Sequence, residues 1–420
     1  MLWMAAILVI QFLGSIVQLL LVTRILGLEG FGILALFIAV TSLSYGLMSM
    51  PGHEAITTYV TRSMVNEEWE EAARILRFIF MACFILALLT YSLLTVFSHP
   101  VSRVLGIDNS HVNTMLIYGL SGICMAVHRE SMAVLRLAGR LSWGFVVICT
   151  AILIQFAGLL ITLALDGSLG MVVLALVAGA CINGFGMLLV AIIATRTLGI
   201  DKLFTSWSVK IPKDTMRYQA ISFCQAKIGT LGGNVDMLLL GALTNPSQVG
   251  LYRAASRILA ITRMPFQPIA PVLQAEYSRR WYAHEGAALR TTARRFTLLA
   301  LGLAVSGYLL LLLFHRPIIS VMLGEEFVDT GRLLIIMIPG ALVFTSITAL
   351  YILPAATGHA VPSLIWHLAA LVTQVSVLLF LLPEYGAVGA AWANMSYFLV
   401  WGLVAIPFSV LILRRSYRLS

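Results

Sequence analysis

Residues Arg77–Ala87 read RFIFMACFILA, and Arg295–Val305, about 218 residues further along the chain, read RFTLLALGLAV. Both stretches open on Arg-Phe and continue as apolar runs typical of membrane-spanning helices. The same offset aligns identical residues in order along both halves: Gly32 with Gly250, Tyr59 with Tyr277, Arg62 with Arg280, Glu67 with Glu285, Ser102 with Ser320 and Leu105-Gly106 with Leu323-Gly324. One residue of slippage continues the series: Gly139 with Gly358, Gly167 with Gly386 and Gly170 with Gly389. So long a repeat in an apolar chain predicts two related lobes with a site between them, as in transporters.

The composition indicates a membrane protein. Hydrophobic residues make up 60% of the 420-residue chain and charged residues 11%, with a mean hydropathy of +0.96, whereas a soluble domain carries about 25% charged residues. Apolar runs of about 20 residues predict helices, because backbone groups in lipid must be satisfied internally. The length of the runs and the weak strand-like alternation argue against a β-barrel. Five cysteines lie in apolar runs without metal-like spacing and are expected to be core residues: Cys83, Cys124, Cys149, Cys181 and Cys224.

Twelve spans are expected, which gives an all-α polytopic fold of two parallel-repeat, six-helix lobes around a central cavity. They cover about 4–23, 31–60, 75–98, 112–135, 143–165, 169–195, 218–243, 248–275, 296–315, 331–356, 361–383 and 387–413. Residues 1–196 are expected to form the N-terminal lobe and residues 218–420 the C-terminal lobe. The polar stretch 197–217 is expected to be a cytoplasmic linker. The first run lacks the basic start and cleavage site of a signal peptide, so it counts as a span.

Lysine and arginine are unevenly distributed between the two sets of loops. One set holds 18 of the 27, and the other holds only Arg24, Arg103, Arg316 and Arg332. Because cytoplasmic loops carry the excess of basic residues, both termini are predicted to be cytoplasmic. Six spans per lobe is an even number, so both lobes share one orientation. The net charge of +9 fits anchoring to anionic membrane lipids, and the chain contains no recognisable nucleic-acid module.

Two segments resemble a known family. TRILGLEGFGILALF (Thr23–Phe37) is similar to the opening signature of Wzx-type polysaccharide-biosynthesis flippases, and NVDMLLLGALTNPSQVGLYRAASRI (Asn234–Ile258) is similar to the start of their second lobe. These proteins belong to the multidrug/oligosaccharidyl-lipid/polysaccharide (MOP) exporter superfamily, and the resemblance extends over essentially the whole chain.

The resemblance implies a function as well as a fold. An undecaprenyl-pyrophosphate-linked oligosaccharide would move from the cytoplasmic to the periplasmic leaflet of the bacterial inner membrane by alternating access. An ion gradient of H⁺ or Na⁺ would drive it, and no cofactor is expected. The glycan would be an O-antigen (lipopolysaccharide), capsule or exopolysaccharide unit, which the motifs do not distinguish. A polysaccharide polymerase and a chain-length regulator are implied partners.

Five basic residues fall inside predicted spans, where a charge is costly and marks a functional candidate. A carrier of an anionic lipid diphosphate needs a cationic lumen, and the planar fork of arginine suits phosphate. The candidate substrate-binding residues are Lys227, Arg257, Arg263, Arg129 and Arg253. Lys227, near the expected midplane, is the leading candidate. The alternative is that these residues form structural ion pairs: Arg253 with Asp236, Arg129 with Glu54, and Lys227 with another helix.

Carboxylates and prolines in the spans suggest coupling and gating. Asp236, Glu130 and Glu54 are candidates for ion coupling, because a carboxylate in a partly dry lumen can exchange a proton. They would serve equally well to neutralise nearby arginines. Pro265 and Pro268, with Pro51 near the corresponding point of the second span, predict kinks that either gate the cavity or simply shape its wall.

Two other classes of protein agree less well with the sequence than a lipid-linked oligosaccharide flippase does. A cation-coupled multidrug exporter of the same superfamily shares the architecture, but exporting cationic drugs favours an acidic, aromatic cavity rather than five basic residues. A membrane-bound polymerase, ligase or glycosyltransferase is expected to carry a sizeable extramembrane loop or a carboxylate cluster. Here the outer loops are short, and Asp201 and Asp214 are isolated. The sequence therefore favours a transporter over an enzyme.

Overall fold

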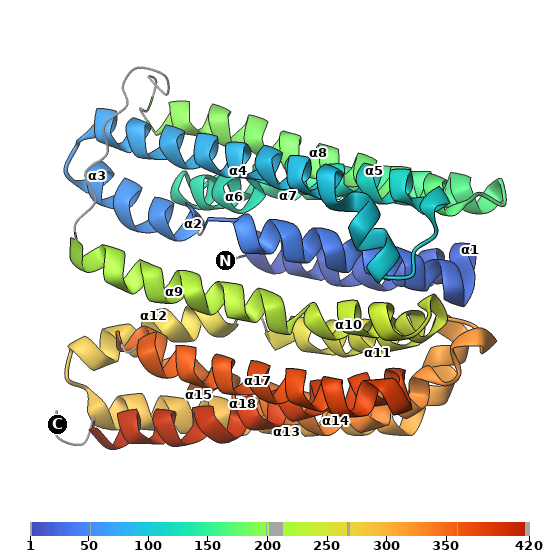
Figure 1. Cartoon of the computed structure of the whole chain (residues 1–420). Coiled ribbons are helices and arrows are strands. Elements are labelled where there is room, and N and C mark those ends of the chain that lie inside the picture. Colours follow the sequence, from blue (N-terminus) through green and yellow to red (C-terminus); the bar gives the residue numbers. More distant parts are fainter. Residues whose placement is uncertain are drawn as a thin grey trace. The chain divides into compact units, whose positions relative to one another are not determined.

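The chain is helical in the computed structural model, which describes residues 2–50, 52–198, 200, 213–266, 269–358 and 360–415 (Figure 1). These residues contain no strand, and the predicted all-α polytopic fold is confirmed. Eight helices in this part of the chain are long and apolar enough to cross a membrane. A ninth span results if Thr330–Ser346 and Thr348–Ala356, bent by 51°, are counted as one. The count of twelve, which includes the broken helices described below, stays a prediction.

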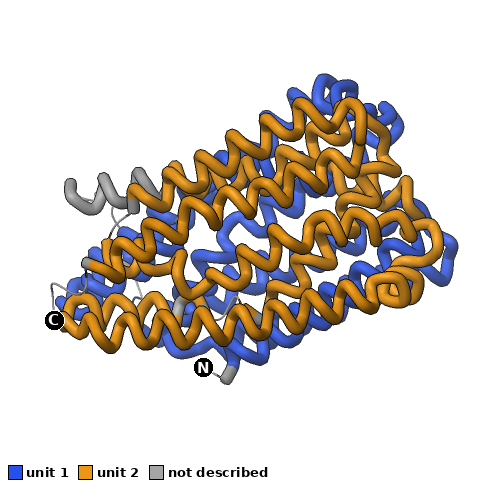
Figure 2. The backbone as a smooth tube through the Cα atoms, turned by 90° about the horizontal axis from the view of Figure 1, so that it is seen from below, with its two compact units in different colours: residues 1–26, 37–216 blue, residues 27–36, 217–420 orange. Residues whose placement is uncertain are grey.

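Contacts within the chain define two compact units (Figure 2). Unit 1 comprises Met1–Leu26 and Phe37–Met216, and unit 2 comprises Gly27–Leu36 and Arg217–Ser420. The segment Gly27–Leu36 therefore groups with unit 2, although it lies within the first half of the sequence repeat. Most of the predicted linker, 197–217, lies outside the described residues.

Unit 1 contains the helices of the first half of the chain, apart from residues Gly27–Leu36 of α1. They are α1 (Leu2–Met48), α2 (Gly52–Ala55), the π-helical turn η1 (Ile56–Val60), α3 (Thr61–Val65), α4 (Trp69–Val104), the 3-10 turn η2 (Asn109–His111), α5 (Val112–Cys124), α6 (His128–Leu137), α7 (Leu141–Ala164) and α8 (Leu169–Thr197). The first two predicted spans are joined within α1, which bends at Gly27 (φ 64°). Helix α7 packs along α8, and so do α5 and α6.

Unit 2 contains the helices of the second half, several of them broken. They are α9 (Lys213–Gly232), α10 (Val235–Leu243), α11 (Pro246–Arg263), η3 (Met264–Phe266), α12 (Ile269–Tyr282), α13 (Gly286–Met322), η4 (Glu325–Phe327), α14 (Thr330–Ser346), α15 (Thr348–Tyr351), α16 (Leu353–Ala356), α17 (Ala360–Tyr385) and α18 (Ala387–Arg415). Helix α18 packs along both α14 and α17.

The sequence repeat has a structural counterpart in the two longest unbroken helices, α4 and α13. Each ends at a glycine in the left-handed region, Gly106 (φ 64°) and Gly324 (φ 98°), and each is followed by a short 3-10 turn. Only glycine adopts this conformation without strain. The aligned Leu-Gly pairs of the repeat are therefore the points where equivalent helices stop.

A second pair of aligned glycines, Gly32 and Gly250, brings two backbones together within unit 2. A Cβ atom on Gly32 would lie 1.8 Å from the carbonyl oxygen of Pro246, and one on Gly250 would lie 2.5 Å from that of Leu28. Nearby, the Glu326 carboxylate accepts a hydrogen bond of 3.0 Å from the backbone N–H of Leu28. Small residues permit this close crossing, which explains why Gly27–Leu36 packs with unit 2.

Only two of the five cysteines are buried as expected. Cys83 and Cys124 are buried, Cys149 and Cys181 are half-buried, and Cys224 is exposed on α9. The apolar surroundings of Cys224 in the sequence do not make it a core residue, because an apolar helix face that meets lipid is also exposed in the protein itself.

Candidate functional site

Asp236 is one of two deeply buried carboxylates among the predicted candidates. It is the second residue of α10, and 4% of its surface is exposed. One carboxylate oxygen accepts a hydrogen bond of 2.8 Å from the N–H of Met237, and the other accepts from the hydroxyl of Tyr252 on α11. The Nε2 atom of Gln374 on α17 lies 3.4 Å from the second oxygen. A buried carboxylate is thus surrounded by polar side chains from two neighbouring helices.

The break between α9 and α10 is part of this site. It frees the carbonyl of Gly232, which accepts a hydrogen bond of 3.1 Å from Gln374 Nε2. Gln374 itself is fully buried, and its Oε1 has no partner among the described residues. The side chain of Asn394 interacts with both Asp236 and Tyr252. Oxygen atoms therefore converge here, a chemistry that suits a proton or a small hard cation.

The sequence analysis missed the partners of Asp236. Tyr252 and Gln374 are both buried to within 1% of their surface. A glutamine in the middle of the apolar run 361–383 was the available signal, because a buried amide requires partners.

Arg263, the last residue of α11, lies among aromatic rings. Its guanidinium carbon is 4.9 Å from the ring centroid of Phe398 and 5.7 Å from that of Phe344. Its Nε donates a hydrogen bond of 3.2 Å to the carbonyl of Leu259. These contacts hold the side chain in a cation–π arrangement, which reduces its availability to a phosphate.

The other three predicted cations of the second half lie on α9 and α11. Lys227 is half-buried, with its Nζ 4.4 Å from the ring centroid of Phe223 one turn away. Arg253 and Arg257 are half-buried one turn apart on α11. All three take part in further polar or electrostatic contacts. Residues four apart lie on the same face of a helix, so Arg253 and Arg257 present two positive charges along one side of α11.

Glu130 forms a separate buried site in unit 1. It lies on α6 with 3% of its surface exposed. Its carboxyl group interacts with the thiol of Cys83 and the backbone of His53. A Cβ on Gly52 would lie only 3.1 Å from Glu130 Oε1. The absence of a side chain at Gly52 therefore makes room for this carboxyl group.

Arg129 and Glu54 do not form the structural ion pair considered from the sequence. Both side chains are exposed, and within the described part of the chain no ion pair joins them. Adjacent helix positions face different directions, so Arg129 is exposed while Glu130 is buried, although the two charges still interact electrostatically.

One of the three predicted proline kinks lies within the described residues, at a break between helices. Pro265 lies in η3, between α11 and α12, while Pro268 lies outside the described residues. Pro51 also lies outside them, between the end of α1 at Met48 and the start of α2 at Gly52.

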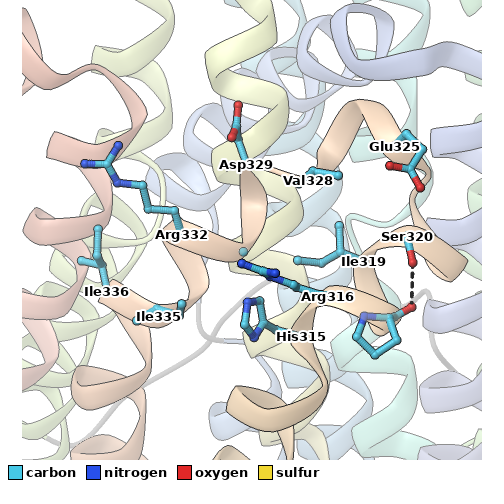
Figure 3. Close-up of a pocket in the computed structure, with 12 residues that line it drawn as sticks. His315, Arg316, Ile319, Ser320, Glu325, Val328, Asp329, Arg332, Ile335 and Ile336 are labelled. Carbon is cyan, nitrogen blue, oxygen red and sulfur yellow. Dashed lines mark hydrogen bonds between the residues drawn. The ribbon is translucent and has the colours of Figure 1, made fainter.

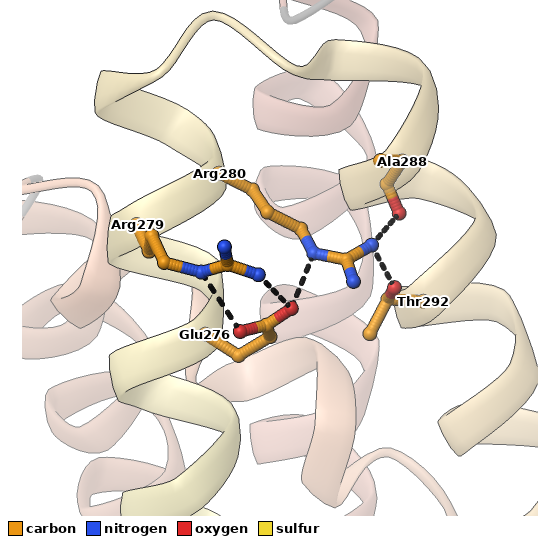
Figure 4. A network of polar contacts seen from close by, with 5 residues as sticks. All are labelled: Glu276, Arg279, Arg280, Ala288 and Thr292. Carbon is orange, nitrogen blue, oxygen red and sulfur yellow. Dashed lines mark hydrogen bonds and ion pairs between the residues drawn. The ribbon is translucent and has the colours of Figure 1, made fainter.

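A polar network fixes the turn from α12 to α13 (Figure 4). Glu276 accepts hydrogen bonds from Arg279 Nη2 at 2.9 Å and from Arg280 Nε at 2.6 Å. Arg280 also donates to the carbonyl of Ala288, at 2.7 Å, and to the hydroxyl of Thr292 on α13. These hydrogen bonds, first that from Arg279 and then that from Arg280, lower the pKa of Glu276 below its ordinary value. The network ties α12 to α13 at the arginine-rich end expected to face the cytoplasm.

Comparison with known proteins places the chain in a family. The polysaccharide biosynthesis protein family matches residues 21–331. The chain belongs to this family. The resemblance noted in the sequence is thereby confirmed.

This polysaccharide biosynthesis protein is similar to a probable low-salt glycan biosynthesis flippase, Agl15, of Haloferax volcanii. The two are 26% identical over 223 residues, which cover 51% of this chain and 46% of Agl15. The match thus spans about half the length of that relative.

Two solved structures share the fold. One is an inward-facing multidrug resistance MATE family transporter of the MOP superfamily, with a TM-score of 0.76 at 14% identity over 97% of this chain and 96% of that one. The other is the lipid II flippase MurJ in an inward closed conformation, with a TM-score of 0.66 at 15% identity over 99% and 90%. At these identities the likeness concerns the fold alone.

Proposed function

We propose that this protein is a flippase for a lipid-linked oligosaccharide. Its substrate is an undecaprenyl-pyrophosphate-linked unit of an envelope polysaccharide, carried by alternating access from the cytoplasmic to the periplasmic leaflet of the bacterial inner membrane. The observation that carries the proposal is the family match over residues 21–331, supported by the similarity to Agl15. The protein acts as a transporter and not as an enzyme.

The positive charges of α9 and α11 provide the means to bind the diphosphate of such a substrate. Arg253 and Arg257 lie on one face of α11, and Lys227 lies on α9. A diphosphate carries several acceptor oxygens, and arginine donates to two of them at once. Arg263 has a different role in this proposal, because its aromatic contacts make it a structural cation. Arg129, exposed on α6, contacts the entering headgroup.

Translocation by wild-type and variant proteins tests this proposal. Proteoliposomes carrying a fluorescent lipid-diphosphate oligosaccharide are expected to show transport that falls at least about tenfold in Lys227→Ala and in Arg257→Ala, since each removes a charge-assisted contact. Arg257→Lys retains the positive charge but lacks the planar guanidinium group, so its transport rate should lie between those of wild type and Arg257→Ala. Arg103→Ala, in an opposite loop, is the matched control. If wild type instead moves an organic cation and no lipid-linked glycan, the protein is a drug exporter.

Asp236 is the proposed coupling residue. Oxygen atoms for H⁺ or Na⁺ within unit 2 come from its carboxylate, from the hydroxyl of Tyr252 and from Oε1 of Gln374, which has no partner among the described residues. Asp236→Asn preserves the shape but removes the negative charge, and it should make transport independent of the ion gradient. Imposing a pH gradient and a Na⁺ gradient separately identifies the ion. If transport by Asp236→Asn still depends on the ion gradient, then Asp236 is not the coupling residue, and Glu130 or Glu54 becomes the candidate.

The polymerase and the chain-length regulator of the same pathway are proposed partners. Both act on the translocated unit, so proximity to the flippase would shorten its transfer. Chemical crosslinking in native membranes followed by mass spectrometry should recover them with this protein. Recovery no greater than that of an abundant unrelated inner-membrane protein contradicts the proposal.

A further inference from the structure

A cavity of about 630 Å³ lies within unit 2, where α13 ends and α14 begins (Figure 3). Its charged lining comes from both helices and from the turn between them: His315 and Arg316 on α13, Glu325 on η4, Asp329 before α14 and Arg332 on α14. In Figure 3, Arg316 lies near the middle of this group, with Arg332 and Glu325 toward opposite sides of the view. The cavity is separate from the buried residues considered above for transport.

Opposite charges share this cavity without neutralising one another. Within the described part of the chain, neither Arg316 nor Arg332 forms a hydrogen bond or ion pair, and the same holds for the carboxylates of Glu325 and Asp329. The cavity therefore keeps two guanidinium donors and two carboxylate acceptors available. By contrast, Arg279 and Arg280 at the α12–α13 turn both donate hydrogen bonds to Glu276.

His315 adds a positioned imidazole to the lining. Its Nδ1 is 2.7 Å from the carbonyl of Leu312. A carbonyl only accepts, so Nδ1 donates this hydrogen bond. The ring packs against Gly331, where an added Cβ would lie 2.9 Å from the imidazole. The imidazole is therefore held in place by contacts on both α13 and α14.

The position of the cavity is at the edge of a membrane span. Helix α13 qualifies as a span, and α14 begins the bent ninth one. Near the cavity, α13 exposes Leu313 and Phe314, with 65% and 53% of their surfaces accessible. Such apolar surface suits acyl chains. Arg316 and Arg332 are also two of the four basic residues of the sparsely basic loops, which the charge bias assigns to the periplasmic face.

We propose that this cavity binds the headgroup of a zwitterionic membrane lipid of the phosphoethanolamine class. A purely anionic headgroup would meet two carboxylates, and a purely cationic one would meet two guanidinium groups. A phosphate diester that carries an ammonium group satisfies both, with the phosphate at Arg316 and Arg332 and the ammonium at Glu325 and Asp329. The volume lies within the range of small-molecule sites.

Native mass spectrometry of the detergent-solubilised full chain tests the proposal. Phosphatidylethanolamine, phosphatidylglycerol and phosphatidylcholine of matched acyl chains are added at equal concentrations, and the retained lipid is counted. Phosphatidylethanolamine is expected to be retained in preference to both others, because phosphatidylcholine lacks ammonium N–H donors. In Arg316→Gln/Arg332→Gln its retention should fall at least about tenfold. The matched control is Arg103→Gln, which removes an exposed arginine from the corresponding end of unit 1 and should retain lipid as wild type does.

A second variant separates the two halves of the headgroup. Asp329 makes no side-chain capping bond to α14, so Asp329→Asn removes a charge without removing a helix cap. It should lower retention of phosphatidylethanolamine and raise that of phosphatidylglycerol. Thermal unfolding verifies that each variant remains folded.

Several outcomes would overturn the proposal. Equal retention of all three lipids by wild type would show that the protein does not prefer a zwitterionic headgroup. An equal loss of retention in Arg103→Gln, or unchanged retention in Arg316→Gln/Arg332→Gln, would show that the lipid does not bind in this cavity. Binding of soluble phosphoethanolamine without retention of the lipid would assign the cavity to a free phosphate ester. Loss of transport in Lys227→Ala does not bear on these results, so the two proposals succeed or fail separately.

Discussion

Charged side chains in this protein differ in how strongly neighbouring groups stabilise their charge. Outside the spans, Glu276 is the clearest example of a stabilised charge. Its pKa is lowered by hydrogen bonds from Arg279 and then Arg280. A group whose pKa is lower in the folded state stabilises the fold above its ordinary pKa and loses that effect as the pH falls through the lowered value. The stabilisation by Glu276 is therefore fully present at neutral pH and disappears in acid.

The expected result is a pH-dependent difference between wild type and Glu276→Gln. The variant should unfold at a lower temperature at pH 7, and the two melting curves should converge below pH 4, roughly the ordinary pKa of glutamate. The measurement is thermal unfolding in detergent across this range. Glu68→Gln is the matched control, since Glu68 makes no side-chain bond at the start of α4. A difference that is the same at every pH would show that Glu276 acts through packing rather than charge.

Gly52 provides a prediction for the buried site of Glu130. A Cβ there would lie 2.5 Å from Ile79 Cγ2 and 3.1 Å from Glu130 Oε1. Gly52→Ala should therefore destabilise unit 1 by about 1–3 kcal/mol, the usual effect of overpacking. Gly302→Ala on α13, where nothing lies within 4 Å, should be neutral or slightly stabilising. Equal melting temperatures for the two variants would contradict the close approach at Gly52.

The buried carboxylates of the candidate sites could be predicted from the sequence, but their partners could not. Asp236 and Glu130 are visible in the sequence because a carboxylate in an apolar run stands out. Their partners are not, because contact between α10 and α17, or between α6 and α2, depends on how the helices pack. Gln374 is 138 residues from Asp236. No local pattern specifies that pairing.

Among whole helices, too, some features could be predicted from the sequence and others could not. Most predicted spans have a helix at the expected place, because apolar length determines it. The breaks are harder to predict: the run 112–135 is divided into α5 and α6 at Met125–Val127, where the sequence has neither proline nor glycine. The tertiary reason lies on α8. A Cβ on Gly184 would be 1.7 Å from the carbonyl of Cys124, so the end of α5 lies directly on the α8 backbone.

The crossing of Gly27–Leu36 with α11 carries the next prediction. In both Gly32→Ala and Gly250→Ala, the added methyl group meets a backbone carbonyl rather than a side chain that can rotate away. Each variant should lose about 3 kcal/mol or more, or fail to accumulate as folded protein. Gly229→Ala on α9, with open space around it, is the control. Glu326→Gln should have a milder effect, because an amide oxygen still accepts from the N–H of Leu28.

Thermal unfolding and size-exclusion profiles of the variants measure this effect. Wild-type behaviour in both Gly32→Ala and Gly250→Ala would show that the two backbones do not approach as described. The alignment of Gly32 with Gly250 was visible in the sequence, but their mutual contact was not, since a repeat identifies equivalent positions without saying which of them touch.

For the complete chain, the number of membrane crossings can be tested. Eight or nine spans follow from length and composition in the described residues, whereas the repeat predicts twelve. The difference lies mainly in α9–α10 and α11–α12, which are broken and carry charges that lower their hydropathy. If both helix pairs cross, the turn after Leu243 is periplasmic and Glu285 is cytoplasmic. If neither crosses, both positions lie on the cytoplasmic side.

Cysteine labelling in intact cells distinguishes these topologies. Leu243 and Glu285 are both exposed at the ends of their helices, so single cysteines there, in a variant without the native five, should be reactive. We expect Leu243→Cys to react with a membrane-impermeant maleimide from outside and Glu285→Cys to react only after permeabilisation, as the positive-inside bias requires. Protection of Leu243→Cys until permeabilisation would mean that α9–α10 does not cross. The charges on α9 and α11 would then lie outside the membrane, and their proposed role in binding the diphosphate would have to be abandoned.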